Sequence, residues 1–153
     1  MANLKERIQS DLTTSIRAKD SLTSGTLRMV LSAITNEEVS GKEARVLGEQ
    51  DLITVLNREA KKRKESATAF DDANRPELAE KERAELEIIQ AYLPAALSEA
   101  ELNEIISAAV SEVQKSGASG PSAMGAVMKL VSPQVAGRSD GSAVAAAVRT
   151  ALT

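Results

Sequence analysis

Carboxylates are the main side chains able to do chemistry in this 153-residue chain, which contains no Cys and no His. Thiol nucleophiles, zinc sites with sulfur or nitrogen ligands and Ser-His-Asp catalysis are therefore excluded. The carboxylates occur in runs, the longest being Glu80, Glu82, Glu85 and Glu87. General acid–base catalysis needs a carboxylate perturbed by burial or by a like charge, and nothing in this run indicates burial. We expect solvated helix faces, with no catalytic residue, no metal and no cofactor.

A basic run in the middle of the chain is the first candidate for phosphate contact. Arg58, Lys61 and Lys62 share one face of the helix expected there, together with Glu65. Such a half-basic face fits a phosphate backbone or an acidic partner, and the alternative is a solvent face crossed by salt bridges. An aromatic platform for stacking bases is excluded, because the chain has one Phe, one Tyr and no Trp.

Apolar residues recur at helical spacing along the chain, which predicts an all-α fold. The clearest stripe comprises Leu4, Ile8, Leu12 and Ile16, each four residues apart. Helices are expected over about residues 3–17, 26–39, 49–73, 76–93 and 98–116, with a break at 20–25. A short helix from residue 120 should end at Pro133, and Ser139 or Asp140 should cap a last helix.

The pair Leu93-Pro94 is the predicted domain joint. Pro94 disfavours helical geometry at Leu93, and charge density drops beyond it. Residues 1–93 hold 15 of the 19 basic and 17 of the 22 acidic residues. We therefore expect an N-terminal helical domain over residues 1–93 and a small three-helix bundle over 94–153, beginning with a capping box at Ser98 and Glu101.

Net charge and hydropathy narrow the class of partner. The formal net charge is −3, which is not the signature of a strong non-specific nucleic-acid binder. No stretch is apolar for long enough to span a bilayer, and the N-terminal residues do not form a signal peptide. We expect a cytoplasmic protein without a membrane partner.

Several segments in order resemble the YqeY family. They are residues 27–34, 36–39, 62–70, 75–79 and 92–94, then Met124-Gly125-x-Val127-Met128 and the turn Gly137-Arg138-Ser139-Asp140-Gly141. Residues 95–153 are also similar to the C-terminal tail of GatB, the B subunit of the glutamine-dependent aspartyl/glutamyl-tRNA amidotransferase. The resemblance implies a helical N-terminal domain followed by a three-helix tail.

The resemblance implies an accessory protein related to that subunit. In the amidotransferase the tail contacts tRNA, whereas activation and amide transfer occur in domains that this chain lacks. The activity implied by homology is that of a carbon–nitrogen ligase with glutamine as amido-N-donor, and we do not expect it to be intrinsic. The expected partner is tRNA or an RNA-linked protein complex. The candidate RNA contacts in the tail are Arg138, Lys129, Arg149 and Lys115.

Three positions depart from the family pattern and predict weak tRNA binding. Ala123 and Ala126 stand where an acid and a Lys are frequent, and Ser139 stands where Ala is common. Each lost phosphate contact lowers both affinity and its salt dependence. A protein–protein module that docks through the N-terminal helices, without tRNA, is the alternative function.

Overall fold

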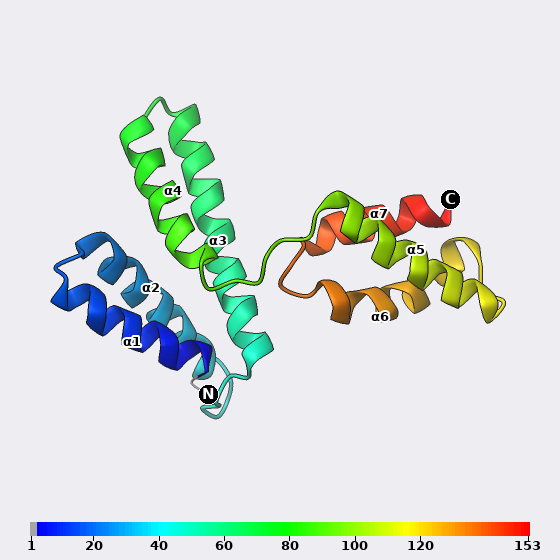
Figure 1. Cartoon of the computed structure of the whole chain (residues 1–153), viewed down its shortest axis with the longest axis horizontal. Helices are drawn as coiled ribbons and strands as arrows, with labels where there is room; N and C mark the ends of the chain where they lie inside the picture. The colour runs from blue at the N-terminus through cyan, green and yellow to red at the C-terminus, as the bar shows by residue number, and fades with distance from the viewer. Residues whose placement is uncertain (1–2) are drawn as a thin grey trace. The chain divides into compact units, whose positions relative to one another are not determined.

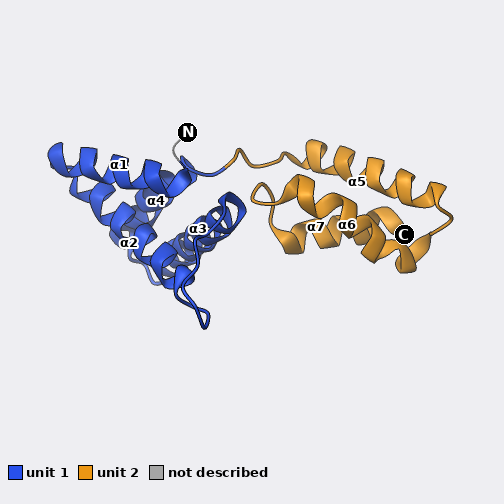
Figure 2. Ribbon diagram, turned by 90° about the horizontal axis from the view of Figure 1, so that it is seen from below, with its two compact units in different colours: residues 1–93 blue, residues 94–153 orange. Residues whose placement is uncertain are grey.

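The computed structural model describes residues 3–153, and their regular structure is entirely helical, which confirms the all-α prediction (Figure 1). The chain divides into two compact units, Met1–Leu93 and Pro94–Thr153 (Figure 2). Unit 1 contains α1 (Leu4–Arg17), α2 (Ser21–Glu38), α3 (Glu49–Asp72) and α4 (Pro76–Gln90). Unit 2 contains α5 (Glu99–Lys115), the 3₁₀ turn η1 (Gly120–Ala123), α6 (Met124–Val135) and α7 (Gly141–Leu152). None of the described helices is long and apolar enough to cross a bilayer.

Unit 1 is built from two helical hairpins, α1–α2 and α3–α4 (Figure 1). The apolar stripe of each helix faces a shared core. The most deeply buried aliphatic side chains come from all four helices: Ile8, Leu27, Ile34, Leu52, Leu56 and Ile89. The half-buried Tyr92 and Leu93, which follow α4, pack against the same core, so unit 1 extends to the last residue before Pro94.

The predicted break at residues 20–25 is wrong for most of its length, because α2 begins at Ser21. The Asp20 carboxylate accepts hydrogen bonds from the Thr23 backbone N–H at 3.1 Å and from its hydroxyl at 2.6 Å. Asp20 is thus the N-cap of α2 and satisfies donors that the first turn leaves free. The chain reverses direction just before Asp20, where Lys19 adopts a φ of 59°.

Unit 2 is a three-helix bundle around a core rich in valine. The buried valines come from α5, α6 and α7: Val110, Val113, Val127, Val131, Val135, Val144 and Val148. The predicted capping box is confirmed, since the Glu101 N–H donates to Ser98 Oγ at 3.2 Å and the Ser98 N–H donates to Glu101 Oε2 at 2.8 Å. α5 ends before Gly117, whose φ of 92° is costly for any residue with a Cβ.

The expectation that Pro133 ends its helix is wrong, because α6 continues to Val135. The Ala136 N–H still donates to the Ser132 carbonyl at 3.0 Å. A proline inside a helix removes one hydrogen bond to the preceding turn. Here the loss falls in the last turn of the helix, where few bonds remain to be disturbed.

The first prediction concerns the core of unit 2. Ile106→Ala should lower the free energy of unfolding by about 2–5 kcal/mol, because Ile106 is only 2% exposed and its truncation leaves a cavity. Leu130→Ala is the matched control, and at 41% exposure it should change stability by less than about 1 kcal/mol. Urea unfolding followed by the amide signals of residues in unit 2 measures both. Equal effects of the two substitutions would contradict the assigned core.

Candidate functional site

The predicted basic face of α3 is largely neutralised by neighbouring carboxylates. Arg58 Nη1 lies 3.2 Å from Glu37 Oε2 on α2, and Lys62 Nζ lies 2.9 Å from Glu59 Oε1. Lys61 is exposed and makes no ion pair within the described part of the chain. Two of the three cations are thus paired with carboxylates, and both remain exposed. The geometry is that of a solvent face crossed by salt bridges, which is the alternative named for this run.

Arg63, Glu59 and Glu85 form a buried ionic cluster that the sequence does not predict. Their side chains are 8–9% exposed. Arg63 Nη1 lies 2.6 Å from Glu59 Oε2, and Arg63 Nε lies 3.6 Å from Glu85 Oε2 on α4. Arg63 Nη2 contacts the sulfur of Met29 on α2 at 3.7 Å. One guanidinium thus links α2, α3 and α4.

The expectation that the carboxylates of α4 are all solvated is therefore wrong for Glu85. Glu85 lies four residues before the fully buried Ile89, on the same face of α4. That spacing is the signal in the sequence that could have identified its burial. Its charge is compatible with burial because a guanidinium faces it, since buried charges in proteins are paired.

The ionic cluster keeps the Glu59 carboxylate charged. Burial alone would raise the pKa of Glu59, but hydrogen bonds from Lys62 and Arg63 outweigh it and hold the pKa below its ordinary value. Among the described residues, the Nε–H of Arg63 has no hydrogen-bond acceptor within range. A carboxylate with a lowered pKa is a poor general acid at neutral pH. The arrangement suits the joining of helices better than proton transfer.

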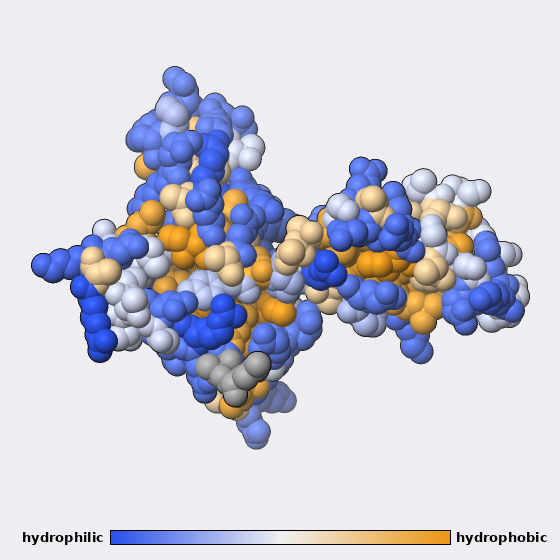
Figure 3. Space-filling view, in the orientation of Figure 1, coloured by the Kyte–Doolittle hydropathy of each residue, from blue (hydrophilic) through white to orange (hydrophobic). Residues whose placement is uncertain are grey.

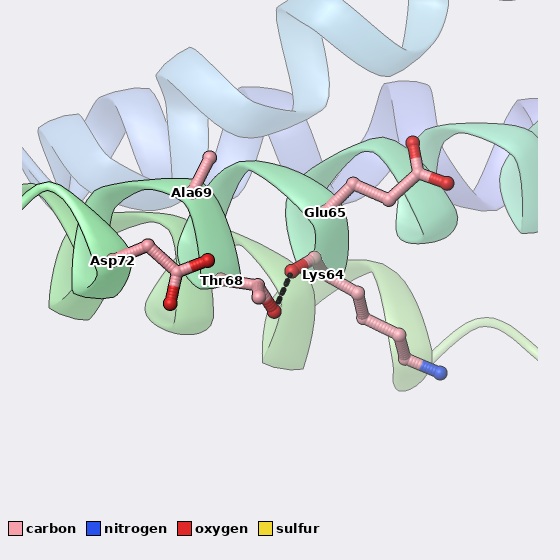
Figure 4. A pocket seen from close by; sticks show the side chains of 5 residues that line it. All are labelled: Lys64, Glu65, Thr68, Ala69 and Asp72. Atoms are coloured by element: carbon pink, nitrogen blue, oxygen red, sulfur yellow. Dashed lines mark hydrogen bonds between the residues drawn. The ribbon is translucent and has the colours of Figure 1, made fainter.

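A shallow hollow of about 360 Å³ lies on one face of α3. Figure 4 shows the side chains that line it. Its lining comes from one helix: Lys64, Glu65, Thr68, Ala69 and Asp72. The charged side chains point apart, and the Thr68 hydroxyl donates to the backbone of its own helix at 3.1 Å (Figure 4). No second element closes the hollow, so it does not bring functional groups together. Across residues 3–153 no three acidic side chains are grouped closely enough to hold a metal ion.

The four candidate RNA contacts in unit 2 differ in how far they are already engaged. Lys115 lies 3.6 Å from Glu112 Oε2, one turn away on α5. Lys129 on α6 and Arg149 on α7 are exposed, and neither forms an ion pair with any residue that the structure describes. These two cations are therefore the most available for phosphate.

Arg138, the leading candidate, is tied to its own chain. It lies in the turn between α6 and α7, next to Gly137, whose φ is 75°. Its Nε–H donates to the Ala95 carbonyl at 3.1 Å, and its own carbonyl accepts from the Leu97 N–H at 2.9 Å. Arg138 as a whole is only half-buried, so part of the residue still faces solvent.

Tyr92, the residue before the predicted joint at Leu93 and Pro94, is held by contacts with α1. The Tyr92 hydroxyl donates to Asp11 Oδ2 on α1 at 2.5 Å, and the Arg7 guanidinium lies over the ring, 5.7 Å from its centre. Burial raises the pKa of the phenol, and the carboxylate of Asp11 raises it further. The phenol therefore stays protonated and remains a hydrogen-bond donor at all physiological pH values.

Comparison with known proteins identifies one matching family model, described as "Yqey-like protein", over residues 5–152. Several relatives share the name "Altered inheritance of mitochondria protein 41, mitochondrial". The one from Lachancea thermotolerans is 38% identical over 78% of this chain and 62% of its own length. The one from Clavispora lusitaniae is 32% identical over 87% of this chain and 76% of its own length. The one from Pyrenophora tritici-repentis is 27% identical over 82% of this chain and 69% of its own length. The chain spans about half (46%) of the length of another relative with this name, from Vanderwaltozyma polyspora.

These names correct one expectation from the sequence. The predicted cytoplasmic location is wrong by this comparison, because the relatives are named as mitochondrial proteins. The prediction rested on the lack of an apolar N-terminal segment. That criterion detects secretory signals and membrane spans, and it is blind to amphipathic targeting segments.

The second prediction tests the ionic cluster. Glu59→Gln should lower the free energy of unfolding by about 2–3 kcal/mol at pH 7, because it leaves the Arg63 guanidinium buried with Glu85 as its one charged neighbour. The contribution of Glu59 is present above the ordinary pKa of 4.5 and is lost as the pH falls through the lowered folded-state value. The difference between wild type and variant should therefore shrink between pH 5 and pH 3.

The matched control is Glu80→Gln, which removes the exposed ion pair between Glu80 and Arg83, one turn apart on α4. It should lower the free energy of unfolding by less than about 0.5 kcal/mol. Urea unfolding of the three proteins at several pH values gives the comparison. A pH-independent difference would show that Glu59 acts through packing and not through its charge.

Proposed function

The chain belongs to the YqeY-like family, and on that premise we propose that it is an accessory protein whose second unit binds the phosphate backbone of a tRNA weakly. The role is that of an adaptor, which brings RNA to a partner or to a complex that acts on it. The proposal does not extend to the glutamine-dependent ligase activity that the GatB resemblance implies. The tail of that subunit is the part the chain resembles, and the reaction takes place elsewhere.

One observation carries the proposal: the charges of unit 2 are separated along its sequence. Four of its five acidic residues lie on α5, whereas residues 113–153 hold Lys115, Lys129, Arg138 and Arg149 against Asp140 alone. The helices α6 and α7 are thus cationic although the whole protein is acidic. A local excess of cations is sufficient to attract a polyanion at low salt.

The expected affinity is low because few of these cations are free. Lys115 is paired with Glu112, and Arg138 is bonded to Ala95, which leaves Lys129 and Arg149 as the principal contacts. Two phosphate contacts correspond to a slope of about −1.5 in a plot of log affinity against log salt concentration. Such binding would be measurable at low salt and marginal at physiological salt.

The third prediction tests this assignment. The double variant Lys129→Ala/Arg149→Ala should bind tRNA about tenfold more weakly than wild type at low salt, and its salt slope should fall towards zero. Filter retention of labelled tRNA across a salt series measures both quantities. The charge-matched control is Lys61→Ala/Lys64→Ala on α3, which should leave binding unchanged. Absence of retention for wild type at any salt, or equal loss in both double variants, would rule out the proposal.

A second candidate function, protein binding through unit 1, is favoured by apolar side chains at its surface. Leu22 and Met29 are seven residues apart on one face of α2 and are 40% and 43% exposed. Figure 3 shows hydrophobic residues reaching the surface of unit 1 among charged ones. Exposed apolar residues that share a helix face are typical of docking surfaces. This surface replaces the basic face of α3 as the candidate for docking.

The fourth prediction separates the two functions. Leu22→Lys/Met29→Gln should abolish co-purification of a protein partner from cells while leaving tRNA retention in place. The change at Met29 is a neutral one because the Met29 sulfur contacts the Arg63 guanidinium. Val46→Lys, at a loop position that is 92% exposed, adds a charge to the same unit and should have no effect. A partner that survives the double substitution, or one that is lost equally with Val46→Lys, would exclude docking through this face of α2.

A further inference from the structure

The guanidinium of Arg63 offers more hydrogen-bond donors than its surroundings use. Its Nη1 donates to Glu59 Oε2 at 2.6 Å and to the Glu59 carbonyl at 3.2 Å. Its Nε–H finds no hydrogen-bond acceptor among the described residues, and the facing Glu85 Oε2 lies 3.6 Å away. Its Nη2 meets the sulfur of Met29 at 3.7 Å. Arg63 is 6% exposed, so solvent has little access to complete the set.

The sulfur of Met29 is the weakest of these acceptors. A thioether accepts hydrogen bonds poorly, whereas a charged guanidinium forms its strong bonds with oxygen. Within residues 3–153, this sulfur is the sole hydrogen-bond acceptor of Arg63 Nη2. A charged donor is therefore paired with a weak acceptor at this point of the cluster, and an oxygen atom bonded to the sulfur would correct the mismatch.

Met29 is also open to reagents from solvent. The residue is 43% exposed, whereas Met124 and Met128 are half-buried against the core of unit 2. Exposed methionines are the ones that oxidants reach most easily. We propose that Met29 is a modification site, at which a peroxide forms a sulfoxide that the buried guanidinium of Arg63 holds by a hydrogen bond. The inference concerns unit 1 alone and rests on neither of the proposed functions.

The reaction balances with a peroxide as the oxidant. The thioether sulfur attacks one oxygen of hydrogen peroxide, so that the S–O bond forms as the O–O bond breaks. The sulfur loses two electrons, and the departing hydroxide takes the proton of the transferred hydroxyl and leaves as water. The sulfoxide oxygen is polar and a far better acceptor than the sulfur it replaces. The flexible side chain of methionine lets that oxygen turn towards Nη2.

The position of Met29 should reverse the usual effect of this modification on stability. Oxidation of a methionine in an apolar core is disruptive, because it places a polar group among aliphatic side chains. At Met29 the new oxygen meets a buried, charged donor that has only sulfur to bond. Glutamine reproduces this arrangement without an oxidant, because its carbonyl oxygen is bonded to the δ atom, as the oxygen of the sulfoxide is.

The fifth prediction treats the full-length chain with hydrogen peroxide. Peptide mass mapping should show the gain of one oxygen at Met29 about tenfold faster than at Met124 and Met128. The melting temperature of unit 1, followed through its own amide signals, should rise by about 4 °C, the shift that one hydrogen bond gives in a unit of this size. Met29→Leu is the control, because its three remaining methionines still react, and its melting temperature should not rise.

Substitutions test the hydrogen bond separately from the reaction. Met29→Gln should melt about 4 °C higher than Met29→Leu, because it supplies an oxygen acceptor to Arg63. Met128→Gln should melt lower than Met128→Leu, because Met128 packs against the valine core of unit 2. Equal oxidation rates at Met29 and Met128, a lower melting temperature of the oxidised unit 1, or a glutamine variant that melts below the leucine variant at position 29 would each overturn the proposal. None of these measurements involves RNA or a partner protein, so their failure is independent of the proposed functions.

Discussion

The burial of one guanidinium sets the architecture of unit 1. Arg63 cannot enter the interior without counter-charges, because an isolated buried charge costs several kcal/mol. Glu59 supplies one from the same helix, and Glu85 supplies the other from α4. Met29 fills the remaining side from α2. The position of α3 is therefore specified relative to both of its neighbours, which aliphatic contacts alone would fix less sharply because they lack direction.

The same requirement for pairing explains which parts of the structure could be predicted from the sequence. Helix positions follow from local signals, namely the stripe of Leu4 and Ile8, Pro76 in the first turn of α4, and the capping box at Ser98. Each signal acts within about one or two turns. The failures at Asp20 and Pro133 concern helix ends, where a single side chain decides between capping and breaking.

The charged residues were predicted less well because their roles depend on partners distant in sequence. Arg58 looks available in the sequence, yet its acceptor Glu37 lies 21 residues away. Arg138 likewise meets Ala95 across 43 residues. No periodicity reports such pairs. Lys129 and Arg149, which form no ion pair among residues 3–153, lie on two different helices of unit 2, so their common availability also emerges only in the folded chain.

The valine core of unit 2 has a thermodynamic consequence. Valine is stiff about χ1 and has essentially one rotamer in a helix, so its burial loses less conformational entropy than that of a long, flexible side chain. That saving matters in a unit of some 60 residues, which has little apolar surface to bury. Valine is also a weaker helix former than leucine or alanine. Helices such as α6 and α7 should therefore be poorly populated as isolated peptides, and secondary and tertiary structure in this unit should form together.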